Sequence, residues 1–319
     1  MTTKTPHVLL AGATGYVGRA VARELVARGY GVTAMARDQE QTVPDCEMLN
    51  YEQLEAGPSE DTNTRVYDAV ISCVASRSGA PQDAWRVDHD LNQRLLSFAR
   101  NVGARQFILL SAICVQKPKL AFQFAKLAFE QALIDSGLTY SIIRPTAYFR
   151  SLSGQVERLR QGKPFLLFAD GKQTACKPIA RRDLAAFLVD CIDRPDRHNA
   201  ILPIGGPGPA ITARQQGELL FYAMQKPPAF RAVPPSMFVW FARVLTPLGW
   251  LLPTMAVKAE FARIAHYYAT ESMLWWNPET GEYDADATPS TGDITLSDHY
   301  AQLVRENTTD HDAGSHKLF

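Results

Sequence analysis

Three glycines near the N-terminus have the spacing of a turn that binds phosphate. Gly12, Gly15 and Gly18 follow an apolar run at residues 8–11 and precede a segment at residues 19–28 with apolar residues at helical spacing. In such a strand–turn–helix unit, the first glycine permits the tight turn, the second lets backbone approach a pyrophosphate, and the third lets helix pack on strand. The helix N-terminus adds N–H groups and partial positive charge. The pattern therefore predicts a dinucleotide-binding turn. Its other members expected to contact the dinucleotide are Thr14, Tyr16 and Val17.

A basic residue stands where many dinucleotide-binding folds carry an acidic one. The second expected strand, residues 32–36, ends at Arg37, and Asp38 follows. A guanidinium suits a ribose 2′-phosphate through forked, charge-assisted hydrogen bonds, whereas a carboxylate suits a free 2′-hydroxyl. The sequence therefore predicts NADPH as the cofactor, and Asp38 leaves NAD open.

Strand and helix patterns alternate through the first half of the chain, as in a parallel sheet with helices on both faces. Strands are expected at residues 8–11, 32–36, 69–74, 107–111 and 140–144, and helices at 19–28, 85–102 and 120–136. After these, helices are expected at 151–161, 183–192 and 212–224, and strands at 165–168 and 200–204. We predict an α/β fold, a Rossmann-like doubly wound parallel sheet with a smaller C-terminal substrate-binding lobe. The predicted divisions are an NADP(H)-binding domain at 1–148 to which later segments return, a lobe mainly at 149–306, and a disordered tail at 307–319.

Parallel sheets bind ligands beyond the carboxyl ends of their strands. Ser76, Ser111 and Pro145 stand at or just after such ends, so we expect them to line the cofactor crevice. Phe122 and Lys126 lie between the last two strands, one helical turn apart on one face. Lys126 is a candidate to hold the nicotinamide ribose hydroxyls and to relay a proton, which a phenyl ring cannot do.

These positions resemble the short-chain dehydrogenase/reductase superfamily, in which a Tyr-x-x-x-Lys pair lies on this helix and a serine ends the preceding strand. Lys126 matches the lysine, Ser111 lies near the serine's place, and Phe122 takes the tyrosine position. The resemblance therefore implies the superfamily's fold and a cofactor role for Lys126. The departure at Phe122 argues against alcohol–ketone chemistry by a tyrosinate.

Longer segments are similar to the divinyl chlorophyllide 8-vinyl reductase family, from His7 to about Glu306. They are residues 110–118, 137–147, 170–172, 175–179, 202–208, 267–273 and 277–283. That family itself carries phenylalanine at position 122. The resemblance implies an NADPH-dependent oxidoreductase that reduces the 8-vinyl group of divinyl chlorophyllide a, or divinyl protochlorophyllide, to ethyl in chlorophyll and bacteriochlorophyll biosynthesis. Hydride addition to a conjugated carbon–carbon double bond needs no oxyanion donor, so the missing tyrosine fits that chemistry.

A flat tetrapyrrole needs aromatic walls and an anchor for its carboxylate. The wall candidates are Phe122, Tyr148, Trp240 and Trp250, with Phe149, Phe241, Trp275 and Trp276 also considered. The candidate carboxylate partners are Arg150, Lys163 and Lys177. His266 is weighed as a ligand of the pigment's magnesium and as a structural histidine, and no protein metal site is predicted. Tyr148, Cys114 and water are alternatives to Lys126 as proton donor.

Charge and cysteine usage limit the partners. Lysine plus arginine number 33, as do aspartate plus glutamate, and no long basic run occurs, which argues against nucleic acid as a partner. Five cysteines without a CxxC pair favour reduced thiols, and residues 1–7 lack a signal- or transit-peptide pattern, so we expect a cytoplasmic protein of bacterial type.

The apolar segment 238–257 is broken by Arg243 and two prolines, which disfavours a membrane span. It predicts a buried helix pair, and a ligand wall or a surface resting on a photosynthetic membrane stays open.

Two other functions stay open. The loss of the tyrosine at Phe122 also fits a non-catalytic NADP(H)-binding redox sensor or an accessory subunit of a membrane complex. The retained lysine fits an ene or ether reductase that acts on another aromatic substrate. Pigment binding distinguishes these alternatives from the 8-vinyl reductase, and the sequence leaves the oligomeric state open.

Overall fold

The computed structural model describes residues 5–36, 42–54, 66–248 and 252–308. Arg37, Asp38, Trp250 and most of the predicted tail therefore lie outside the described residues. Among the described residues, seven strands form one sheet in the order β3-β2-β1-β4-β5-β6-β9, and every neighbouring pair is parallel. These strands are β1 (His7–Ala11), β2 (Gly31–Ala36), β3 (Glu47–Asn50), β4 (Ala69–Ser72), β5 (Gln106–Leu110), β6 (Thr139–Pro145) and β9 (Ala200–Ile204). The predicted doubly wound sheet is confirmed, and its order reverses between β1 and β4.

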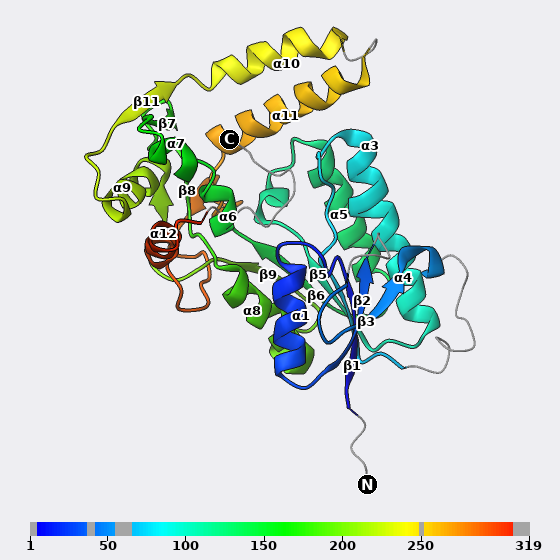
Figure 1. Cartoon of the computed structure of the whole chain (residues 1–319). Coiled ribbons are helices and arrows are strands. Elements are labelled where there is room, and N and C mark those ends of the chain that lie inside the picture. Colours follow the sequence, from blue (N-terminus) through cyan, green and yellow to red (C-terminus); the bar gives the residue numbers. More distant parts are fainter. Residues whose placement is uncertain (1–4, 37–41, 55–65, 249–251, 309–319) are drawn as a thin grey trace.

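Helices cover both faces of this sheet (Figure 1). On one face α1 (Gly18–Ala27) and α8 (Arg181–Asp193) share an apolar core with β1 and β4. On the other face α4 (Asn92–Asn101) and α5 (Ala121–Ile134) pack on the same strands. The shorter helical segments of this half are η1 (Tyr51–Leu54), α3 (Pro81–Ala84), the π-helix η2 (Trp85–Leu91) and η3 (Ile113–Gln116). The helix expected at 85–102 thus begins with a π-helical stretch.

A second apolar core belongs to the segments after residue 148. Its small sheets pair β7 (Phe165–Phe168) with β11 (Phe230–Val233), β8 (Ala175–Cys176) with β10 (Ile211–Thr212), and β12 (Trp275–Asn277) with β13 (Glu282–Asp284). Its helical segments are α6 (Phe149–Leu152), α7 (Val156–Arg160), α9 (Ala213–Ala223) and α12 (Leu296–Arg305). The short helix η4 (Pro195–Arg197) instead connects α8 to β9 of the large sheet. The single helix expected at 151–161 is wrong, because residues 153–155 separate α6 from α7. Thr212 caps α9 as expected, accepting a hydrogen bond from Gln215.

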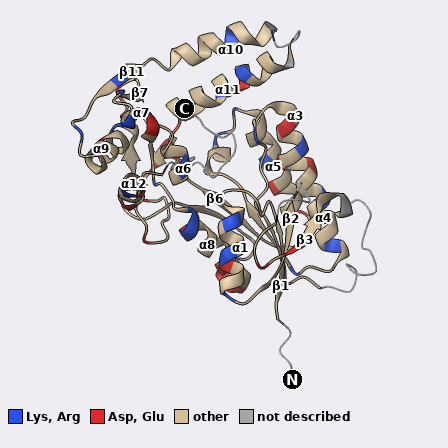
Figure 2. Ribbon diagram, viewed as in Figure 1, with Lys and Arg blue, Asp and Glu red and all other residues tan. Residues whose placement is uncertain are grey.

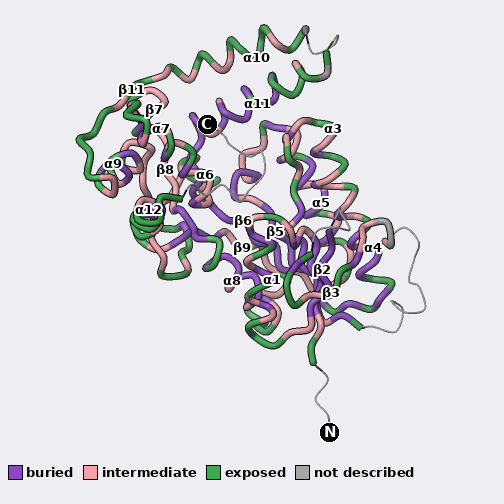
Figure 3. Tube along the Cα trace, viewed as in Figure 1, coloured by how far each residue is buried: buried purple, intermediate pink, exposed green. Residues whose placement is uncertain are grey.

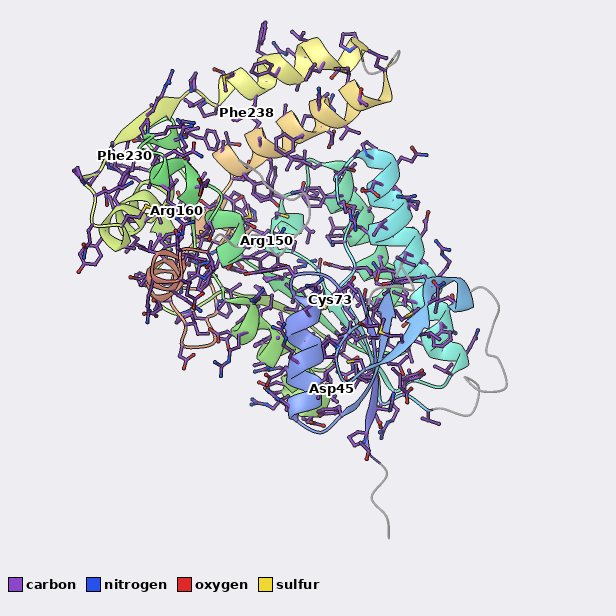
Figure 4. All side chains as sticks on the ribbon, viewed as in Figure 1. Asp45, Cys73, Arg150, Arg160, Phe230 and Phe238 are labelled. Atoms are coloured by element: carbon purple, nitrogen blue, oxygen red, sulfur yellow. The ribbon has the colours of Figure 1, made fainter. Side chains whose placement is uncertain are left out.

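The apolar segment forms a helical hairpin beside the carboxyl ends of the strands (Figure 1). Its helices are α10 (Ser236–Leu248) and α11 (Pro253–Thr270), so the predicted helix pair is confirmed. The prediction that this pair is buried is wrong for α10. Figure 3 shows α10 as mostly exposed or intermediate, and Trp240 is 61% exposed. The ring of Phe238 contacts that of Phe168 at 5.3 Å and ties the start of α10 to the lobe (Figure 4). Among the described helices, none has the length and hydropathy needed to cross a bilayer.

Candidate active site

The glycine turn between β1 and α1 is closed too tightly for side chains. Gly12 has φ +75°, and a Cβ there would lie 2.8 Å from the carbonyl carbon of Cys73, at the end of β4 (Figure 4). A Cβ on Gly18 would lie 2.0 Å from the carbonyl oxygen of Gly12. The Gly15 N–H donates to the same oxygen at 3.0 Å. Because α1 begins here without an acidic residue in its first turn, the turn fits a dinucleotide pyrophosphate.

Two arginines from the segments after residue 148 flank this turn through Tyr16. The guanidinium carbons of Arg150 and Arg181 lie 5.3 and 5.2 Å from the centre of the Tyr16 ring. Tyr148 lies on the same ring, with centroids 6.3 Å apart. Sequence reasoning considered Arg150 only for a carboxylate and missed Arg181. The position of Arg181 in the first turn of α8 offered only a weak signal for a role at the glycine turn.

Lys126 is held by a buried carboxylate. Its ammonium lies 2.9 Å from Oδ1 of Asp88, and Asp88 is 1% exposed and Lys126 9%. The backbone N–H of Ser76 points at both oxygens of Asp88, at 3.4 Å each. Asp88 stands in the π-helix, a distortion often found at functional sites. Sequence reasoning missed Asp88, although an acid three residues before Leu91 on an apolar helix face was a usable signal.

Ser111 lies at the end of β5 as expected, but its hydroxyl is already engaged. Ser111 Oγ donates to Glu130, which is 2% exposed and forms an ion pair with Arg144. Pro145, at the end of β6, is buried, and Ser76 is half-buried. The structure thus brings Ser76 to Lys126 through Asp88, whereas Ser111 links the end of β5 to α5 through Glu130. Their contacts with a cofactor stay predictions.

Aromatic side chains join α5 to α11 beside Lys126. Phe122 packs in a cluster with Cys114, Ile264 and Tyr267. The Tyr267 hydroxyl donates to the carbonyl of Cys114 at 2.9 Å. Burial raises the pKa of Tyr148 well above its usual range and also raises the pKa of the Cys114 thiol. Both candidate donors therefore hold their protons at neutral pH.

The other pigment candidates are dispersed. Phe149 is a core residue, 2% exposed and stacked on His299 at 5.2 Å, which excludes it as a wall. Trp240 contacts Phe241 on the outer face of the hairpin, with ring centroids 5.3 Å apart. The indole of Trp276 is covered by the Lys117 ammonium, 3.9 Å from its centre. The remaining predicted residues have other positions: Trp275 is half-buried in β12, Lys163 donates to Gln161, and Lys177 donates to the carbonyl of Thr288.

The parallel sheet and its closed glycine turn define a dinucleotide-binding protein of Rossmann-like fold, and residues 12–195 match the NAD(P)H-binding family model. The chain is 43% identical over 332 residues to a divinyl chlorophyllide a 8-vinyl-reductase of Arabidopsis thaliana, covering 98% of this chain and 80% of the relative. The Zea mays protein of that name is 44% identical over 98% of this chain and 82% of its own length. The protein belongs to the divinyl chlorophyllide a 8-vinyl-reductase family.

Solved structures agree on the fold. Leucoanthocyanidin reductase from Vitis vinifera, in its binary complex with NADPH, superposes with a TM-score of 0.66 at 14% identity, covering 94% of this chain and 99% of that one. UDP-glucose 4-epimerase from Thermotoga maritima gives 0.65 at 14% identity, covering 94% and 97%. At these identities the likeness shows the shared Rossmann-like architecture.

Proposed function

We propose that this protein uses NADPH to reduce the 8-vinyl group of divinyl chlorophyllide a, or of divinyl protochlorophyllide, to ethyl. The observation that carries the proposal is the pair on α5: Lys126 is retained and held by Asp88, whereas the residue one turn earlier is Phe122. A reaction at a conjugated carbon–carbon bond needs no oxyanion donor, because the macrocycle delocalises the charge. The relatives named for that reaction, which match 98% of this chain, support the same conclusion.

The glycine turn, Lys126 and Arg37 have separate proposed tasks in holding the cofactor. When bound, NADPH supplies the hydride, and the protein supplies orientation. The closed turn at Gly12 and Gly18 admits the pyrophosphate to bare backbone. Lys126, held by Asp88, orients the nicotinamide ribose by donating to its hydroxyls. Arg37, outside the described residues, is the proposed partner of the 2′-phosphate.

The proton for the second carbon comes from a group that is protonated at neutral pH. Tyr148 fits this requirement, since its pKa is raised by burial and its ring lies beside Tyr16 of the glycine turn. Cys114 also meets it. Replacing Tyr148 with phenylalanine separates the two, because only a Tyr148 donor would make this variant slow at full pigment affinity.

The direct test mixes the protein with 3,8-divinyl chlorophyllide a and NADPH or NADH in the dark. Conversion to the monovinyl pigment shifts the Soret band to the blue and changes chromatographic retention. We expect conversion with NADPH and much less with NADH. NADPH binding without pigment binding would instead favour the redox sensor or accessory subunit. Turnover of another aromatic substrate in place of the pigment would favour the ene or ether reductase.

We also propose that the hairpin rests on the surface of an anionic, photosynthetic membrane. Large apolar side chains of the hairpin are exposed: Met237, Trp240, Phe241, Val244, Leu252, Val257 and Phe261. Figure 2 shows α10 as almost free of charged residues, and the described hairpin carries three cations against one carboxylate, the buried Glu260. An apolar face with an exposed tryptophan and a net positive charge suits the bilayer interface. Co-sedimentation with anionic vesicles, lost in Trp240→Ser, tests this, and equal sedimentation of both proteins would refute it.

A further inference from the structure

A cavity of about 320 Å³ lies between the two helices of the hairpin and the start of α5. Its lining includes the cations Lys119, Arg243 and Arg263 and the apolar residues Leu120, Phe238 and Val239. Its walls are thus partly apolar and partly cationic, and none of the lining residues is acidic. Such a lining suits an organic anion with an apolar body.

The cations of this cavity differ in how far they are already engaged. Lys119 donates to Glu271 at 2.5 Å. Arg263 donates to Glu260 at 2.8 Å and to Thr246 at 2.7 Å. Arg243 is exposed and has no hydrogen-bond or ionic partner within the described parts of the chain. Arg243 is therefore the cation that can donate hydrogen bonds to an incoming carboxylate without breaking an existing contact.

The cavity also lies at a useful distance from the proposed reaction centre. Leu120, in its lining, stands six residues before Lys126 at the start of α5, about 9 Å along the helix axis. Phe122 lies between them and packs against α11. In chlorophyllide, the propionate stands across the macrocycle from the 8-vinyl group. A pigment with its vinyl group near Lys126 can therefore place its propionate in the cavity.

We propose that this cavity takes the propionate end of the pigment, with Arg243 as the partner of its carboxylate. The proposal rests on the proposed function and adds a binding partner for the substrate's carboxylate, which favours free acids over esterified pigments. A volume of about 320 Å³ suits one edge of a tetrapyrrole, and the rest of the ring lies toward Phe122. Arg243 is a different partner from the three expected from the sequence: Lys177 donates to Thr288, Lys163 donates to Gln161, and Arg150 lies beside Tyr16 of the glycine turn.

The test compares divinyl chlorophyllide with its propionate methyl ester in detergent solution, without membranes. A charge-assisted hydrogen bond at an exposed rim should make the KM of the ester about tenfold higher than that of the acid in the unmodified protein. Arg243→Gln should raise the KM of the acid until the two pigments are equal, and Arg243→Lys should restore part of the difference. Lys258→Gln makes the same charge change at an exposed position of α11 outside the cavity, and should preserve the tenfold preference.

The outcomes separate this inference from the proposed function. If the unmodified protein reduces acid and ester equally well, or if Arg243→Gln keeps the preference, the cavity assignment is wrong while the reductase function stands. If neither pigment is reduced, the proposed function fails. Tryptophan fluorescence quenching then still decides the cavity assignment, because tighter binding of acid than ester must depend on Arg243.

Discussion

Replacing Asp88 with asparagine removes one charge from the buried pair that holds Lys126 and changes little in shape. Two unit charges 2.9 Å apart attract by about 6 kcal/mol at an effective dielectric constant of about 20, and desolvation offsets much of this. Removing one partner of a buried pair usually costs about 3–5 kcal/mol. We expect Asp88→Asn near the lower end, because an amide oxygen still accepts a hydrogen bond from Lys126.

Urea denaturation and NADPH titration measure the two consequences separately. If Asp88 positions Lys126 for the ribose, the folded Asp88→Asn protein should lose a charge-assisted hydrogen bond, and NADPH affinity should fall about 10–150-fold. A double variant with Lys126→Met should be more stable than Asp88→Asn, because it leaves no unpaired buried charge. The matched control is Asp90→Asn, the same change at a side chain 59% exposed, with an expected cost under about 0.5 kcal/mol.

Two results would refute this reasoning. Stability of Asp88→Asn within about 0.5 kcal/mol of the unmodified protein would show that the ion pair contributes little to folding. Reduced stability with unchanged NADPH affinity would restrict Asp88 to a structural role.

Three further predictions concern the turn, an acid-sensitive contact and the core. Gly12→Ala forces a Cβ at φ +75° to 2.8 Å from the backbone of Cys73, so it should cost more than about 1 kcal/mol in urea unfolding and weaken NADPH binding; unchanged binding would contradict the proposed cradle. Burial raises the pKa of Glu271, but hydrogen bonds from two lysines and Tyr283 outweigh it and hold the pKa at about 2, against 4.5. This carboxylate therefore stabilises the fold above about pH 4.5 by roughly 3 kcal/mol and loses that contribution as the pH falls toward 2. The difference in unfolding free energy between the unmodified protein and Glu271→Gln should shrink in acid, and a difference that stays constant with pH would argue against this. Phe129→Ala empties a fully buried site and should lower the unfolding free energy by about 3–5 kcal/mol, whereas a loss below about 1 kcal/mol would mean that the core refills.

Local chemistry was enough to predict the dinucleotide half of the molecule. An apolar strand, glycines and an amphipathic helix within one short segment encode the β1–turn–α1 unit, because the chain between them is too short to arrange otherwise. The same holds for β9 and for the capped start of α9 at Thr212. The edge strand β3 was not expected, since Glu47 and Met48 are exposed and leave no continuous apolar run.

Only the tertiary structure decided which polar groups meet. The pairing of Lys126 with Asp88, and of Ser111 with Glu130, joins residues on different elements, and no local pattern specifies such partners. The exposure of α10 is a second example. Hydrophobic residues predict burial only when another element covers them, and in the described structure nothing covers the outer face at Trp240. The sequence by itself thus determined the dinucleotide-binding fold and the family, because both are encoded in short segments of neighbouring residues. The site's ion pair and the cavity at the hairpin depend on contacts between distant segments.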